Sequence, residues 1–119
     1  MTIRSESVDK AFKLIRGEMK KSRGKIKNSQ VNPEIKQVYK LKLRILIDIK
    51  YIFNEYLTEI DPVVKAFHEK DIFPKFINKE IGVCEECSAY HDDRLIPTTL
   101  YAFRIELMKR LLEKYDKVV

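Results

Sequence analysis

The sequence has few residues that break or turn a chain. It contains three Gly and four Pro among 119 residues. Gly and Pro dominate turns, so their scarcity argues against a turn-rich fold. We therefore expect long secondary-structure elements joined by few connections.

Long uncharged apolar runs and cysteines are also scarce. No stretch approaches the roughly 18 apolar residues of a membrane span, and no secretory pattern follows Met1. We expect an intracellular, cytoplasmic protein with no membrane partner. In such a protein the two cysteines stay reduced or bind metal more often than they form a structural disulfide.

The residues that are abundant are apolar and charged, at 45% and 35% of the chain. This apolar fraction is too high for a disordered chain, and the length suits one domain over residues 1–119. The charge is unevenly placed. Residues 1–50 hold 14 Lys/Arg and 5 Asp/Glu, a balance of +9, whereas residues 51–119 hold 10 and 13, a balance of −3. The asymmetry predicts a polyanionic or acidic partner for the N-terminal half.

The stretch 32–60 is the central element of the predicted fold. Asn32-Pro33-Glu34 is a helix-start signature, with a capping side chain, a proline suited to the first turn and an acidic residue at the positive end of the dipole. Apolar residues then recur at helical spacing: Ile35, Val38, Tyr39, Ile45, Leu46, Ile49, Ile52, Phe53, Tyr56, Leu57 and Ile60. A strand over 41–51 is the alternative, because apolar and charged residues partly alternate there.

Two further long helices are predicted, at 5–22 and 98–117. The first has an apolar stripe of Val8, Ala11, Phe12, Ile15 and Met19, and Gly24 is its expected stop. Residues 22–32 are expected to form a basic loop. One or two short helices are expected between 61 and 77, and an irregular Cys/His loop over 79–97. The predicted fold class is all-α, a small bundle of three principal helices.

The residues with metal-binding potential cluster within 24 positions. They are His68, Cys84, Cys87 and His91. The Cys-x2-Cys spacing lets two thiolates bind one ion, and four such ligands can complete a structural zinc site. The alternatives are cysteines without metal and a redox pair, and Glu85 and Glu86 between the cysteines disfavour a reactive thiolate.

The same segment has a local resemblance to a known family. Gly82-Val83-Cys84-Glu85-Glu86-Cys87, followed by Asp92-Asp93-Arg94-Leu95 and Pro97, resembles the first half of the zinc finger in the TraR/DnaK-suppressor family of RNA-polymerase regulators. The resemblance covers residues 82–97 only. It implies a bound zinc ion, although the second cysteine pair of that finger has no counterpart here.

Catalytic motifs are missing, so we expect a binding protein and not an enzyme. The leading hypothesis is a small basic accessory protein that binds nucleic acid, DNA or RNA, by contacting phosphates through residues 10–50. The alternative is a protein-interaction module that meets an acidic surface, such as an adaptor or inhibitor of a nucleic-acid enzyme. The candidate contact residues are Lys10, Lys13, Arg16, Lys20, Lys21, Arg23, Lys25, Lys27, Lys36, Lys40, Lys42 and Arg44.

Overall fold

The computed structural model describes residues 6–60, 69–90 and 95–117, and within these ranges all of the regular secondary structure is helical. Its elements are α1 (Glu6–Lys27), α2 (Pro33–Glu59), the short 3-10 helix η1 (Glu69–Asp71), α4 (Ile72–Tyr90) and α5 (Leu95–Lys117). The described part therefore has four long helices, where the sequence predicted three. The predicted helix over 32–60 is confirmed, and the alternative of a strand over 41–51 is wrong, because those residues lie inside α2.

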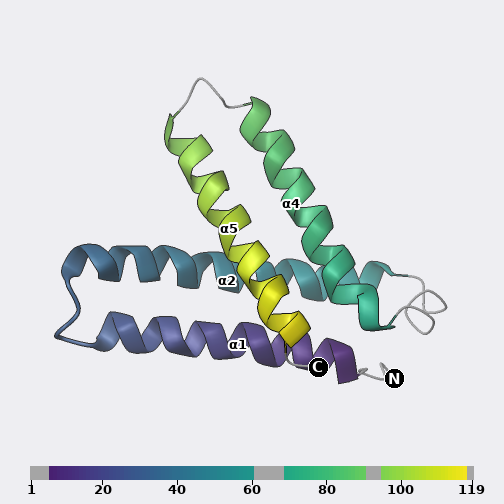
Figure 1. Ribbon diagram of the computed structural model, residues 1–119, viewed down its shortest axis with the longest axis horizontal. Coiled ribbons are helices and arrows are strands. Elements are labelled where there is room, and N and C mark those ends of the chain that lie inside the picture. The colour runs from purple at the N-terminus through teal and green to yellow at the C-terminus, as the bar shows by residue number, and fades with distance from the viewer. Residues whose placement is uncertain (1–5, 61–68, 91–94, 118–119) are drawn as a thin grey trace.

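The long helices form two antiparallel hairpins that cross (Figure 1). In the first, α1 and α2 lie side by side, joined by the short connection 28–32. In the second, α4 and α5 lie side by side, and part of this hairpin projects beyond the first. The α4–α5 hairpin packs on α1 where the two cross.

The start of α2 follows the predicted capping chemistry. The side chain of Asn32 accepts a hydrogen bond from the backbone N–H of Glu34 at 2.8 Å, and Pro33 occupies the first turn. This side chain satisfies one of the backbone donors left free at a helix start. The cap fixes where α2 begins, and the short connection 28–32 keeps this point close to the end of α1.

The hydrophobic core lies where the hairpins cross, and Phe53 is at its centre. Its ring centroid is 5.0 Å from that of Phe12 in α1, and 5.3 Å and 4.9 Å from those of Phe73 and Phe76 in α4. Tyr115 of α5 completes the group, with its ring 5.0 Å from Phe73. Aromatic pairs at these separations add to the burial of apolar area. All four long helices thus contribute to one core.

Three helix boundaries correct the sequence prediction. The last helix, predicted from residue 98, begins at Leu95. Gly24 does not end α1, which continues to Lys27, because Gly24 keeps a negative φ and Ile26 extends the inward-facing stripe beyond it. The Cys/His segment is not an irregular loop throughout, because α4 runs without a break to Tyr90. The predicted short helix near 61–70 lies mainly outside the described residues.

Candidate nucleic-acid interface

A row of cations runs along the exposed side of α1. Its members recur at intervals of three and four residues: Lys13, Arg16, Lys20, Arg23 and Lys27. This spacing keeps side chains on one helix face, and at 1.5 Å per residue the row is about 21 Å long. All five are exposed, and the structure gives them no ion pair within the part of the chain that it describes.

The outer side of α2 continues the same surface. Lys36, Lys40 and Arg44 recur every four residues, and Ile47 and Tyr51 extend their line toward the end of the helix. A shallow groove of about 430 Å³ lies between the helices and is lined by Arg16 as well as by Ile47 and Tyr51. The cations of both helices therefore share one side of the hairpin. We call this surface the basic face; it consists of Lys13, Arg16, Lys20, Arg23, Lys27, Lys36, Lys40, Arg44, Ile47 and Tyr51.

The remaining predicted contact residues lie elsewhere. Lys10 stacks its ammonium over the ring of Tyr115, 4.3 Å from the centroid. Lys21, Lys25 and Lys42 line a separate groove of about 390 Å³ that also includes Glu18 and Lys114. Eight of the twelve predicted residues thus lie on the basic face and four on another side. Lys13 is at the edge of the basic face, because it also lines a groove of about 280 Å³ with Lys10 and Lys21. The expected basic loop at 22–32 is wrong in part, because Arg23, Lys25 and Lys27 belong to α1.

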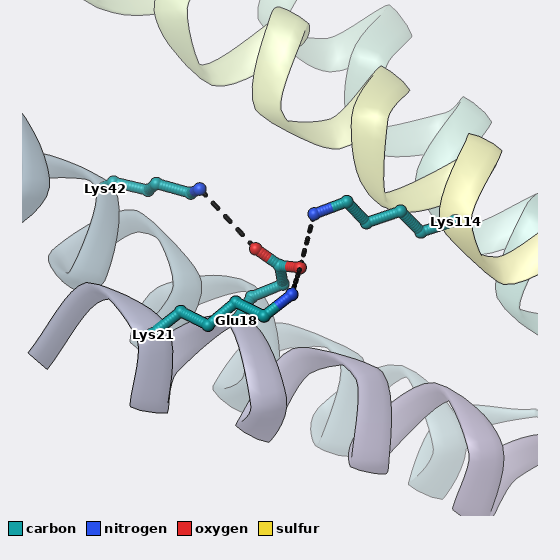
Figure 2. A network of polar contacts seen from close by, with 4 residues as sticks. All are labelled: Glu18, Lys21, Lys42 and Lys114. Atoms are coloured by element: carbon teal, nitrogen blue, oxygen red, sulfur yellow. Dashed lines mark hydrogen bonds and ion pairs between the residues drawn. The ribbon is translucent and has the colours of Figure 1, made fainter. Parts of the chain in front are cut away.

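Glu18 lies at the centre of a cluster with Lys21, Lys42 and Lys114, which we call the Glu18 cluster (Figure 2). Its carboxylate accepts a hydrogen bond from Lys114 Nζ at 2.5 Å and lies 3.5 Å from Lys42 Nζ and 3.7 Å from Lys21 Nζ. These lysines come from α5, α2 and α1, so one buried acid contacts cations from both hairpins. Lys21 and Lys42 are therefore partly engaged within the protein.

The electrostatics of Glu18 follow from this arrangement. Burial alone would raise the pKa of its carboxyl group. The hydrogen bond from Lys114 and the attraction of Lys114, Lys42 and Lys21 outweigh burial, so the pKa of Glu18 is lowered. The group stays ionised at neutral pH and neutralises one of the three surrounding ammonium charges.

The structure adds Ile47 and Tyr51, which the sequence reasoning placed with the core or left out. Tyr51 is 63% exposed and Ile47 is 46% exposed. Their signal is in the sequence: they lie four residues apart and off the stripe that Ile45, Ile49 and Phe53 form. Lys114 and Glu18 were also missed, because they are 96 residues apart and only the fold brings them together.

The predicted zinc ligands are only partly described. Cys84 and Cys87 lie one turn apart on α4, with Cys84 buried and Cys87 half-buried. His68 and His91 lie outside the described residues. Within the described ranges, no group of three or more His, Cys, Asp and Glu residues could hold a metal ion. Burial raises the pKa of the Cys84 thiol and outweighs the effect of Arg104, so this thiol is mostly protonated at neutral pH.

We compared the chain with protein-family models, curated proteins and solved structures, and none of them matches it. The likeness of residues 82–97 to a zinc finger therefore stays a local resemblance. Among the helices of the described ranges, none combines the length and apolar character needed to cross a membrane.

Proposed function

We propose that this protein binds nucleic acid by contacting phosphates with the basic face. The observation that supports the proposal best is the exposed row of five cations on α1. Surface cations usually alternate with carboxylates, which reduce their field. Between Lys13 and Lys27 the one acidic residue is Glu18, which is buried, so no exposed carboxylate separates the cations of this row. Such a row of exposed ammonium and guanidinium groups suits a polyanion.

The charge balance around the row supports the same conclusion. Residues 10–47 contain 12 Lys/Arg and two carboxylates, Glu18 and Glu34. Glu18 is buried and surrounded by lysines, so it contributes little negative field to the basic face. The potential over this part of the first hairpin is therefore positive, whereas the other carboxylates of the hairpin lie toward its opposite end: Glu6, Asp9, Asp48, Glu55 and Glu59. Such a surface attracts a phosphate backbone with an affinity that falls steeply as salt rises.

The geometry favours contact with the phosphate backbone of the nucleic acid over recognition of its base sequence. The basic face consists mostly of long cationic side chains on two regular helices, and its three arginines are the only members that could make paired hydrogen bonds to a base edge. Phosphate contacts fix the position of a protein on nucleic acid but do not select a sequence. We expect binding with little dependence on base order.

The test is fluorescence anisotropy with a labelled oligonucleotide over a range of salt concentrations. The triple variant Arg16→Gln/Lys20→Gln/Arg23→Gln should weaken binding and reduce the slope of log K against log salt by about 2–3, since each lost phosphate contact contributes about 0.9 on a duplex. These positions are exposed, so the variant should keep its fold, which circular dichroism verifies.

A matched control separates the basic face from total charge. Lys75→Gln/Lys109→Gln/Arg110→Gln removes the same three charges from exposed positions on α4 and α5. It should leave the salt slope close to that of the wild type. Equal weakening by both triple variants, or no binding by the wild type at low salt, would contradict the proposal.

A protein partner with an acidic surface is the second candidate. It is favoured by Ile35 and Val38, two apolar residues in the first turns of α2 that are half exposed. An acidic partner could bury them while pairing with neighbouring cations. In that case Ile35→Ser/Val38→Ser should abolish capture of the partner, and nuclease treatment should not.

A further inference from the structure

Ile47 and Tyr51 form an apolar ridge within the basic face. They lie one turn apart on the outer side of α2, and Tyr51 is the most exposed large apolar residue in the described ranges. The buried residues Ile45, Ile49 and Phe53 point the other way, into the core. Tyr51 is therefore not needed to close the core, and its ring presents a free face to solvent.

Cations lie on both flanks of this ridge. On one side Tyr51 and Ile47 line the groove with Arg16 and Lys50. On the other side they line a groove of about 490 Å³ with Arg44 and Arg104. Arg104 is held by Asp48 at 2.5 Å, whereas Arg16 and Arg44 are exposed and have no ion pair in the described ranges. An exposed aromatic ring thus lies between two available guanidinium groups.

This combination suits a single strand better than a duplex. Single strands bind where cations follow the phosphates and aromatic side chains stack on the bases. In a duplex the base faces are covered by their neighbours, so a protruding Tyr finds no stacking partner. The cations beside the ridge are complementary to the phosphates of a single strand, and the exposed ring of Tyr51 is complementary to its unpaired bases.

We propose that the basic face takes single-stranded nucleic acid, with a base stacked on Tyr51 against Ile47 and the adjoining phosphates on Arg16 and Arg44. This inference rests on the proposed function and specifies its ligand. Glu55, one turn further along α2, raises the pKa of the Tyr51 hydroxyl, so the ring stays neutral at neutral pH. Glu55 also repels phosphate, so the strand leaves the ridge before the last turns of α2.

The experiment compares three probes of equal length with the wild type: a thymidine single strand, an abasic single strand and a duplex. The wild type should bind the thymidine strand more tightly than the abasic strand, which has the same phosphates but no bases to stack. Tyr51→Ala should weaken binding of the thymidine strand roughly 5- to 100-fold, as expected for one lost stacking contact. The same variant should leave binding of the abasic strand unchanged.

Two controls test the stacking role itself. Tyr51→Phe keeps the ring and should restore tight binding. The chain has no Trp, so Tyr51→Trp introduces a single indole at the ridge, and its emission should be quenched by the thymidine strand and not by the abasic strand. Leu100→Trp, at an exposed position on α5, should show no such quenching. A ribose strand of the same length distinguishes RNA from DNA as the ligand.

The outcomes separate this inference from the proposed function. If the wild type binds none of the probes at low salt, both fail. If it binds all three with a normal salt slope and Tyr51→Ala has no effect, only the single-strand inference is overturned. Preference for the duplex would overturn it as well.

Discussion

Glu18→Gln is the change that best tests how the two hairpins are held together. Glutamine keeps the volume of the side chain and its oxygen can still accept a hydrogen bond from Lys114, but the negative charge is lost. Three ammonium groups are then left near one another without the carboxylate that they share. We expect the free energy of unfolding to fall, with no change of fold.

The magnitude follows from the exposure of the three lysines. The side chain of Lys21 is 74% exposed, so its pair with Glu18 contributes little. Those of Lys42 and Lys114 are 20% and 44% exposed, and Lys114 makes the short charge-assisted bond. Allowing for solvent screening and for lysines that can swing into water, we expect a loss of about 1–2 kcal/mol. That corresponds to a fall in Tm of about 4–8 °C for a domain of this size.

The dependence on pH provides the second part of this test. The pKa of Glu18 is lower in the folded protein than its ordinary value of 4.5. A lowered pKa stabilises the fold above that ordinary value, and the contribution is lost as pH falls through the folded pKa. The difference in free energy of unfolding between wild type and Glu18→Gln should therefore be constant from about pH 6 to 8, and it should become smaller below about pH 4.5.

The assay is urea unfolding followed by circular dichroism, with Glu113→Gln as the control. Glu113 is an exposed carboxylate on α5, so its change should stay within about 0.5 kcal/mol of the wild type. Combining Glu18→Gln with Lys114→Gln should cost less than the sum of the single changes, because the two residues contact each other. If Glu18→Gln is as stable as the wild type at pH 7, Glu18 and its three lysines have no structural role. A difference in free energy of unfolding that persists at acid pH would refute that role as well.

Two further predictions concern the core and the metal. Phe53→Ala should cost about 3–5 kcal/mol in urea unfolding, because the fully buried ring contacts three other aromatic rings; a smaller loss would mean that the crossing of the hairpins repacks easily. The zinc prediction requires about one zinc per chain in protein purified without chelator, and loss of that zinc in Cys87→Ser. Metal-free protein of full stability would contradict it.

Much of the fold could be predicted from the sequence because its local signals agree with its tertiary structure. Asn32-Pro33 marks the start of α2 both in the sequence and in the structure. The predicted inward stripe of α1 is buried: Val8, Ala11, Phe12, Ile15 and Met19. In α1 the apolar spacing and the charges at the ends agree with the observed helix, and in α2 the apolar spacing and the capping residue do so. Tertiary packing therefore had no local signal to override.

The missed features are those in which tertiary packing outweighs a local signal. Short helices and an irregular loop were predicted where α4 runs without a break, and α4 contains both Pro74 and Gly82, two residues that disfavour a helix interior. Pro74 falls in the first turn, where its missing N–H has no intrahelical acceptor to lose. Gly82 costs about 1 kcal/mol relative to Ala, and the buried residues Phe73, Phe76, Ile77 and Cys84 outweigh that cost. These contacts with other helices could not be read from a helix considered alone.

The structure divides the cations of the first hairpin into two groups with different roles. Those around Glu18 contact a buried carboxylate, and through Lys114 they connect α1 and α2 to α5. Those on the basic face have no partner in the described ranges, so they add mutual repulsion and nothing to the core. This repulsion lowers the stability of the free protein, and a bound polyanion would remove it. Lys20 and Lys21, adjacent in sequence, fall into different groups: Lys20 lies in the row, and Lys21 pairs with Glu18. The helical period of α1, and not the position along the chain, therefore decides which cations are available to a ligand.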